Sequence, residues 1–245
     1  MVGMSKDDSF IDELSKSVAK TTPSLYEPSI QYSLPDPDAK SKNDTTLIPV
    51  IIDTYIREAI KKPVTKEGSA YILKAPEYFE KKYPGETPLV KIGVSTDVPR
   101  RINDLRKSCG LFGLEQVEDN ENIRHRLYYK VEELVHTELA NFNRLFKCGR
   151  CKTKGKDTEH REWFAVSEEV ALTTVQRWRS FVLLDPPPYD DNGILTDHWS
   201  EMLEIRNVIW QQGGDERYDD HEKRNSRWER WLQEEIRATN RITYP

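Results

Sequence analysis

The feature that most limits the fold of this chain is a change of hydrophobic pattern near residue 68. After this point come two short runs, Ala-Tyr-Ile-Leu at 70–73 and Leu-Val-Lys-Ile-Gly-Val at 89–94. Short runs of strand-forming residues that are bounded by polar segments are typical of strands. We expect these two strands to pair, and the polar and aromatic stretch between them to form a short excursion that is longer than a hairpin loop.

Helices are expected to follow these strands. The segment Ser95-Thr96-Asp97 precedes Val98-Pro99, and a capping residue followed by an early proline is typical of a helix start. Further along, the pattern predicts a strand at 126–129, a helix at 131–146, a strand at 162–166 and a helix at 167–178. This order predicts an α+β fold with a small, mainly antiparallel sheet flanked by helices.

The two flanks of the chain differ from this central part. The first 45 residues are rich in Ser, Lys, Asp and Pro and have no sustained hydrophobic period, which predicts a disordered arm. After Leu184, four tryptophans lie on amphipathic helical patterns that are typical of packing surfaces or of partner docking. They are Trp199, Trp210, Trp228 and Trp231.

We therefore divide the chain into four parts. They are a disordered N-terminal tail at 1–45, a docking helix with its linker at 46–66, a central domain at 67–182 and a helical C-terminal extension at 183–245.

The sequence also bounds where the protein acts. No apolar run approaches the roughly 18 residues that a membrane span requires, and the first residues lack the order of a secretory signal. We expect an intracellular protein, nuclear or cytoplasmic, without a membrane partner. The formal net charge of -5 argues against a uniformly basic coat, so contact with nucleic acid would need a local patch.

Five motifs follow one another in the central domain. They are Ser69-Ala70-Tyr71, then Lys91-Ile92-Gly93 with Arg101 beyond it, Glu132-x-x-x-His136, Cys148-Gly-Arg-Cys151, and His160-Arg-Glu-Trp-Phe164. In this order they resemble the GIY-YIG nuclease superfamily, in the variant in which a lysine stands for the second tyrosine of the name. The closer similarity is to its T5orf172 branch, also called the DUF1766 or meiotically up-regulated 113 family.

The resemblance implies a GIY-YIG-type sheet and metal-dependent hydrolysis of phosphodiester bonds in DNA, with RNA as an alternative substrate. It implies catalytic roles for Tyr71, Lys91, Arg101 and Glu132. The ion would be Mg²⁺ or Mn²⁺ bound at Glu132, and His136 could assist proton transfer.

Elementary chemistry supports these roles. Arg101 can hold a phosphate by two parallel hydrogen bonds, and Glu132 is a hard oxygen ligand of the kind that Mg²⁺ prefers. Tyr71 could position or deprotonate water if a cation lowered its pKa, and Lys91 could supply charge beside it. Each residue also has an ordinary reading, as a strand aromatic or as a solvated charge.

Two departures from the pattern favour a second hypothesis. Ser69 stands where the first motif has a glycine, with Gly68 displaced by one, and the spacing from Tyr71 to Lys91 is long. The alternative is a catalytically weak module that binds nucleic acid or protein and keeps the fold and a zinc ion. Glu133 is a rival to Glu132, which we prefer because it shares a helix face with His136.

The cysteine pair is a candidate structural zinc site. Cys148, Cys151 and His160 supply three ligands, and we expect His136 to be the fourth. The alternative is two free cysteines beside an exposed histidine.

Basic residues form the last candidate site. The segment 144–161 contains seven Lys or Arg against two acidic residues, and a second basic group lies near Arg101. If both groups face one cleft they form a phosphate-binding track, whereas the ordinary reading is a solvated loop. The expected contacts are Arg100, Arg106, Lys107, Lys152 and Lys154.

Overall fold

The computed structural model describes residues 49–63, 67–84, 89–120, 122–153, 155–211 and 221–243. The expected disordered arm at 1–45 and the candidate Lys154 lie outside the described residues. No described helix combines the length and the apolar character that crossing a membrane requires.

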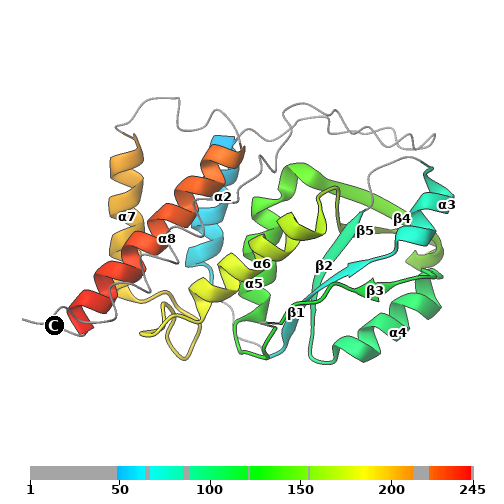
Figure 1. The fold of residues 1–245 in the computed structure, drawn as a ribbon, viewed down its shortest axis with the longest axis horizontal. Coiled ribbons are helices and arrows are strands. Elements are labelled where there is room, and N and C mark those ends of the chain that lie inside the picture. Colours follow the sequence, from blue (N-terminus) through cyan, green and yellow to red (C-terminus); the bar gives the residue numbers. More distant parts are fainter. Residues whose placement is uncertain are drawn as a thin grey trace, which may run out of the picture. The chain divides into compact units, whose positions relative to one another are not determined.

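Five strands form one sheet in the described part of the chain, in the order β3-β1-β2-β5-β4 (Figure 1). The strands are β1 Ser69–Lys74, β2 Val90–Ser95, β3 Glu115–Gln116, β4 Asn143–Thr153 and β5 Lys156–Phe164. Every pairing between neighbours is antiparallel. Together with the helices below, this confirms the predicted α+β class.

The described part of the chain also contains seven α-helices and one 3₁₀ helix. They are α2 Pro49–Lys61, α3 Pro76–Lys82, α4 Val98–Cys109, α5 Tyr128–Glu138, η1 Ala140–Phe142, α6 Glu168–Val182, α7 Asp197–Gln211 and α8 His221–Thr243. Helices α5 and α6 contact β1 and β2, and α4 contacts β2 and β4. Helix α3 occupies the long connection between the first two strands, where we expected a short ordered excursion.

Helix α4 begins and ends where its sequence requires. The Asp97 carboxylate accepts a hydrogen bond from the backbone N–H of Arg100 at 3.0 Å and caps the first turn. Gly110 ends the helix with a left-handed φ of 68°, a conformation that glycine adopts without a steric penalty. These two ends fix which side chains of α4 face the sheet.

The register of the sheet places two candidate site residues on one face. Tyr71 lies opposite Gly93, and Lys91 lies opposite both Leu73 and Trp163. Directly opposed residues of antiparallel strands project from the same face, and so do residues two apart on one strand. Tyr71 and Lys91 therefore share the face that packs on α4.

Two expectations about this region are wrong. The stretch 126–129 is no strand: His125 makes an isolated bridge to Gly68, and α5 already begins at Tyr128. The helix expected at 131–146 ends at Glu138, and residues 143–153 form β4 instead. Residues 143–153 form a strand because they pair with β5 in an antiparallel ladder, and this pairing outweighs the local helical pattern.

The C-terminal extension packs on α6 through a group of aromatic rings that we name the tryptophan junction. Its members are Trp178, Phe181, Trp199, Trp228 and Trp231, all buried. Neighbouring ring centroids lie 5.3 to 6.1 Å apart in edge-to-face contacts. The three described tail tryptophans thus serve packing within the chain, and the side chain of Trp210 lies outside the described part.

A buried ion pair joins the two flanks of the domain. Arg206 of α7 donates a hydrogen bond to the Asp53 carboxylate of α2 at 2.9 Å, and both side chains are almost fully buried. The guanidinium also lies 3.4 Å from the centroid of the Trp228 ring. Helix α2 is further held by Tyr189, whose hydroxyl donates to the Ile60 carbonyl at 2.9 Å.

Candidate active site and metal cluster

Tyr71 lies at the middle of β1 and is only 3% exposed. Its hydroxyl lies directly over the backbone of Gly93, because a Cβ built on that glycine would come 2.6 Å from the hydroxyl oxygen. Any side chain at 93 would displace the phenol. The glycine of the Lys-Ile-Gly motif is therefore needed for the space it leaves.

Arg101 approaches Tyr71 from α4. Its guanidinium donates a hydrogen bond to the Tyr71 hydroxyl, although the arginine side chain is exposed. Burial raises the pKa of Tyr71, and the nearby Arg101 charge opposes this without overcoming it. We expected catalysis by the phenolate only if a cation lowered this pKa. The phenol is instead neutral at neutral pH.

Lys91 lies on β2 beside this pair and is 1% exposed. Burial lowers the pKa of Lys91 to about 7, and the positive charge of Arg101 acts in the same direction. Within the described residues its ammonium has an ion-pair contact with Glu162 and no hydrogen bond. A buried cation with so few partners lowers the stability of the folded protein. Charged groups of this kind are common at functional sites.

Glu132 completes the group from α5. Burial raises the pKa of this half-buried carboxyl to about 7, whereas the charges of Lys91 and Arg101 lower it. Its rival Glu133 contacts other groups: it accepts from Lys130 at 3.0 Å and from Lys62 at 2.6 Å. The structure therefore brings Glu132, and not Glu133, within electrostatic reach of the other three residues.

His136 lies one turn beyond Glu132. Its Nε2 donates to the Ile92 carbonyl at 2.9 Å, and its ring packs 5.0 Å from the Phe164 ring. Burial lowers the pKa of His136 to about 4, so the ring is neutral near pH 7. These contacts join α5 to the sheet.

The expected zinc ligands gather around a different fourth residue. The ligand atoms of Cys109, Cys148, Cys151 and His160 all lie within 4.8 Å of one another, and this set could hold a metal ion. The expectation that His136 is the fourth ligand is wrong, because Cys109 at the end of α4 takes that place. The sequence did contain a signal: the chain has only three cysteines, and the third lies just before the glycine that ends a helix.

The candidate nucleic-acid contacts divide into two groups. Arg100 and Lys107 are exposed on α4, the helix of Arg101, and Lys152 is exposed on β4. The guanidinium of Arg106 instead donates to the Leu114 carbonyl, with Nε at 3.2 Å, and holds the loop after α4. The exposed residues are available to a ligand, while Arg106 has a structural contact.

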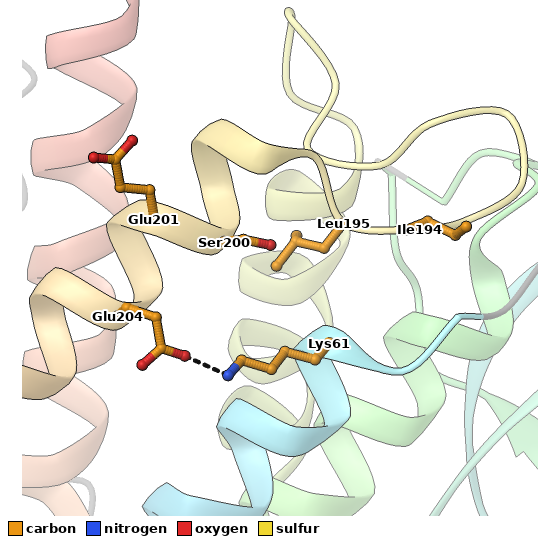
Figure 2. A pocket seen from close by; sticks show the side chains of 6 residues that line it. All are labelled: Lys61, Ile194, Leu195, Ser200, Glu201 and Glu204. Carbon is orange, nitrogen blue, oxygen red and sulfur yellow. Dashed lines mark hydrogen bonds and ion pairs between the residues drawn. The ribbon is translucent and has the colours of Figure 1, made fainter.

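A surface pocket lies elsewhere, between α2, α7 and the loop before α7 (Figure 2). None of the residues described above lines it. Its lysine is neutralised by an ion pair with a glutamate, and no group of catalytic side chains converges there. The lining residues are Lys61, Ile194, Leu195, Ser200, Glu201 and Glu204.

The described sheet and helices place Tyr71, Lys91, Arg101 and Glu132 near one another, and the central part of the chain resembles a nuclease-like, DNA-binding family of domains. The family model of the T5orf172 domain matches residues 68–179. The match covers somewhat less than half of the chain. No curated protein and no solved structure matches the chain.

Proposed function

We propose that this chain hydrolyses phosphodiester bonds of DNA, with a divalent cation, Mg²⁺ or Mn²⁺, bound at Glu132. One observation carries the proposal: four polar side chains from β1, β2, α4 and α5 lie near one another, and they include the buried ammonium of Lys91 and the half-buried carboxyl of Glu132. Burying charged side chains lowers the stability of the folded protein. A catalytic role therefore explains their presence better than a stabilising role does.

Each residue has a role that fits its position. In hydrolysis the oxygen of water bonds to phosphorus and gives up a proton to the solvent, while the bond to the leaving oxygen breaks and the leaving oxygen takes up a proton. The neutral phenol of Tyr71 orients the water by a hydrogen bond. Arg101 is exposed and binds a phosphoryl oxygen, while Lys91 adds positive charge where negative charge grows.

The residues present fit a divalent cation. Magnesium is usually held by one or two carboxylates together with waters and substrate phosphates. No ion pair or hydrogen bond within the described residues occupies the carboxylate of Glu132, and burial makes its charged form unfavourable without a cation. When bound, the cation supplies charge stabilisation on the phosphoryl group and activation of water.

The test uses neighbouring residues as controls. Arg101→Ala and Glu132→Gln should each lower the cleavage rate of linear, nicked or branched DNA by about 10²–10³-fold, the usual cost of losing one preorganised charge. At saturating DNA, Arg100→Ala and Glu133→Gln should have small effects on the rate, because the contact with Tyr71 is made by Arg101 and Glu133 contacts Lys62 and Lys130. Circular dichroism of all four variants checks that each is folded.

Binding separates this proposal from the alternative of a module that binds without cleaving. Glu132→Gln should bind DNA as tightly as the parent or more tightly, because a negative charge has left a phosphate site. A parent protein that binds nucleic acid but cleaves no substrate in either metal, with Glu132→Gln indistinguishable from it, would establish the binding module.

The second proposal concerns the metal cluster: we infer that it holds a structural zinc ion. Three thiols and one imidazole are a common zinc set. The Cys109 sulfur lies 3.4 Å from the Cys151 sulfur and 3.7 Å from Nε2 of His160. Tetrahedral zinc separates such ligands by about 3.6–3.8 Å, so the fit is close. The ion would tie the end of α4 to the β4–β5 hairpin.

Purified protein should contain close to one zinc per chain. Cys109→Ser and His160→Gln should lose it, with a large drop in the unfolding temperature, because zinc binding contributes to the free energy of folding. His136→Gln is the matched control and should keep its zinc. Elemental analysis decides the matter: zinc lost from His136→Gln but kept in Cys109→Ser would refute the assignment.

A further inference from the structure

Glu162 is the carboxylate that contacts the buried ammonium of Lys91 within the described residues. It lies near the end of β5, and 39% of its side chain is exposed, whereas the lysine is almost wholly buried. The pair therefore runs from the interior of the candidate centre to its solvent side. No role in the chemistry proposed above accounts for Glu162.

An irregularity in β5 explains how Glu162 reaches this lysine. Arg144 pairs with Trp163, whereas Phe146 pairs with His160, so β5 has one residue more than β4 over this stretch. The extra residue is a β-bulge at 161–162. Bulges interrupt the alternation of side chains and redirect one of them, and they are frequent beside active sites.

The contacts around the bulge agree with this interpretation. The Phe146 ring packs against both His160 and Trp163, at 5.7 Å in each case, so these two residues lie on one face although they are three apart. In a regular strand, residues three apart point to opposite faces. The interruption falls at Glu162, next to the residue that pairs with Lys91.

A buried ammonium needs such a partner. Removing one member of a buried ion pair leaves an uncompensated charge, which is strongly unfavourable and lets the remaining group move. Lys91 makes no hydrogen bond to another described residue, so Glu162 is the contact that can fix the direction of its ammonium. Functional groups need supporting residues of this kind to hold a productive geometry.

We propose that Glu162 is a positioning residue, which the bulge of β5 directs at Lys91 and which holds the lysine ammonium beside Tyr71. Its contribution to cleavage rests on the hydrolytic function proposed above. The pairing itself does not, and it can be measured in protein that cleaves nothing.

The first test is the rate of DNA cleavage by Glu162→Gln. Supporting residues typically contribute 10- to 100-fold, so kcat should fall by about that factor while the Kd for DNA stays the same or decreases. Glu159→Gln is the control: Glu159 lies on the same strand, is 37% exposed and, among the described residues, has ion pairs with the exposed Lys147 and Arg161. Its kcat should match that of the parent. A parental rate in Glu162→Gln would refute the positioning role.

The second test is a double-mutant cycle with Lys91→Met, read by activity and by thermal unfolding. If Glu162 acts through Lys91, then Glu162→Gln should have no further effect on kcat once Lys91 is Met. In unfolding, Glu162→Gln should lower Tm in the parent but not in Lys91→Met. Independent losses in both readouts would overturn the proposal. If the parent cleaves nothing, the hydrolytic function fails, and coupling in Tm alone decides whether Glu162 holds Lys91.

Discussion

The candidate centre and the tryptophan junction are both formed by side chains from several helices and strands. They differ in how well their buried charges are compensated by neighbouring groups. In the centre, burial moves the pKa of Lys91 down and that of Glu132 up, each to about 7, so both charges are unfavourable in the folded protein. Beside the junction, the buried cation Arg206 is paired with Asp53 and covered by the Trp228 ring. The junction therefore stabilises the folded protein, whereas the buried charges of the centre destabilise it.

This contrast predicts which substitutions will change stability and which will change activity. Changes in the junction should alter unfolding and leave the chemistry of the folded molecule unchanged. Changes in the centre should act mainly on activity and have smaller effects on unfolding, because residues that evolve for function often oppose stability.

The largest expected effect is that of Trp228→Ala. Trp228 is fully buried between Trp178, Trp231 and Arg206, so truncation removes apolar contacts and leaves a cavity. We expect a loss of about 3–5 kcal/mol in the free energy of unfolding. Urea titration measures it, and cleavage per folded molecule should stay at the parental value. A loss below about 1 kcal/mol would mean that the extension does not stabilise the domain.

Gly93→Ala should have an intermediate effect, and mainly on activity. The new methyl would lie 2.6 Å from the Tyr71 hydroxyl oxygen and 2.8 Å from its Cζ, so the phenol must move. A displacement of about 1 Å in a catalytic group costs on the order of 10²-fold in rate. The free energy of unfolding should fall by only about 1–3 kcal/mol, the usual cost of overpacking.

Tyr71→Phe in the Gly93→Ala background sharpens this prediction. It removes the atom nearest to the new methyl, so part of the lost stability should return, whereas activity should not. Unfolding by urea and cleavage of DNA would be measured on the same preparations. No recovery of stability would show that the strain lies somewhere other than the Tyr71 hydroxyl.

The smallest expected effect is a change in the pH dependence of stability. Burial lowers the pKa of His136 from its ordinary 6.5 to about 4, so the folded protein favours the neutral ring. This contribution is complete above pH 6.5 and is lost as the pH falls from 6.5 through 4. His136→Gln does not titrate, so its deficit in unfolding free energy relative to the parent should shrink over this range, by at most about 1.4 kcal/mol per pH unit. A constant deficit from pH 7 to pH 5 would contradict it.

Much of the arrangement around the candidate centre follows from local pattern. Two short apolar runs specify β1 and β2, and the Lys-Ile-Gly motif places Gly93 opposite Tyr71 once those strands pair. The cap at Asp97 sets where α4 begins and hence which way Arg101 points. These signals lie within a few residues of one another, which is the range over which sequence pattern is informative.

The features that were missed depend on distant parts of the chain. Residues 143–146 continue the apolar spacing of α5, and only the pairing with β5 makes them a strand. Cys109 joins the metal cluster because α4 packs on β4, a contact that no spacing along the chain reveals. The bulge at 161–162 likewise exists only in relation to the neighbouring strand.

The ion pair between Asp53 and Arg206 has a consequence for the order in which the protein folds. The two residues are 153 positions apart, with the whole segment that matches the T5orf172 domain between them. During synthesis α2 leaves the ribosome well before α7, so the carboxylate of Asp53 has no Arg206 partner until α7 has emerged. Contacts of such long sequence separation form late and slow the overall rate. The position of helix α2 is thus among the last of the described features to become fixed.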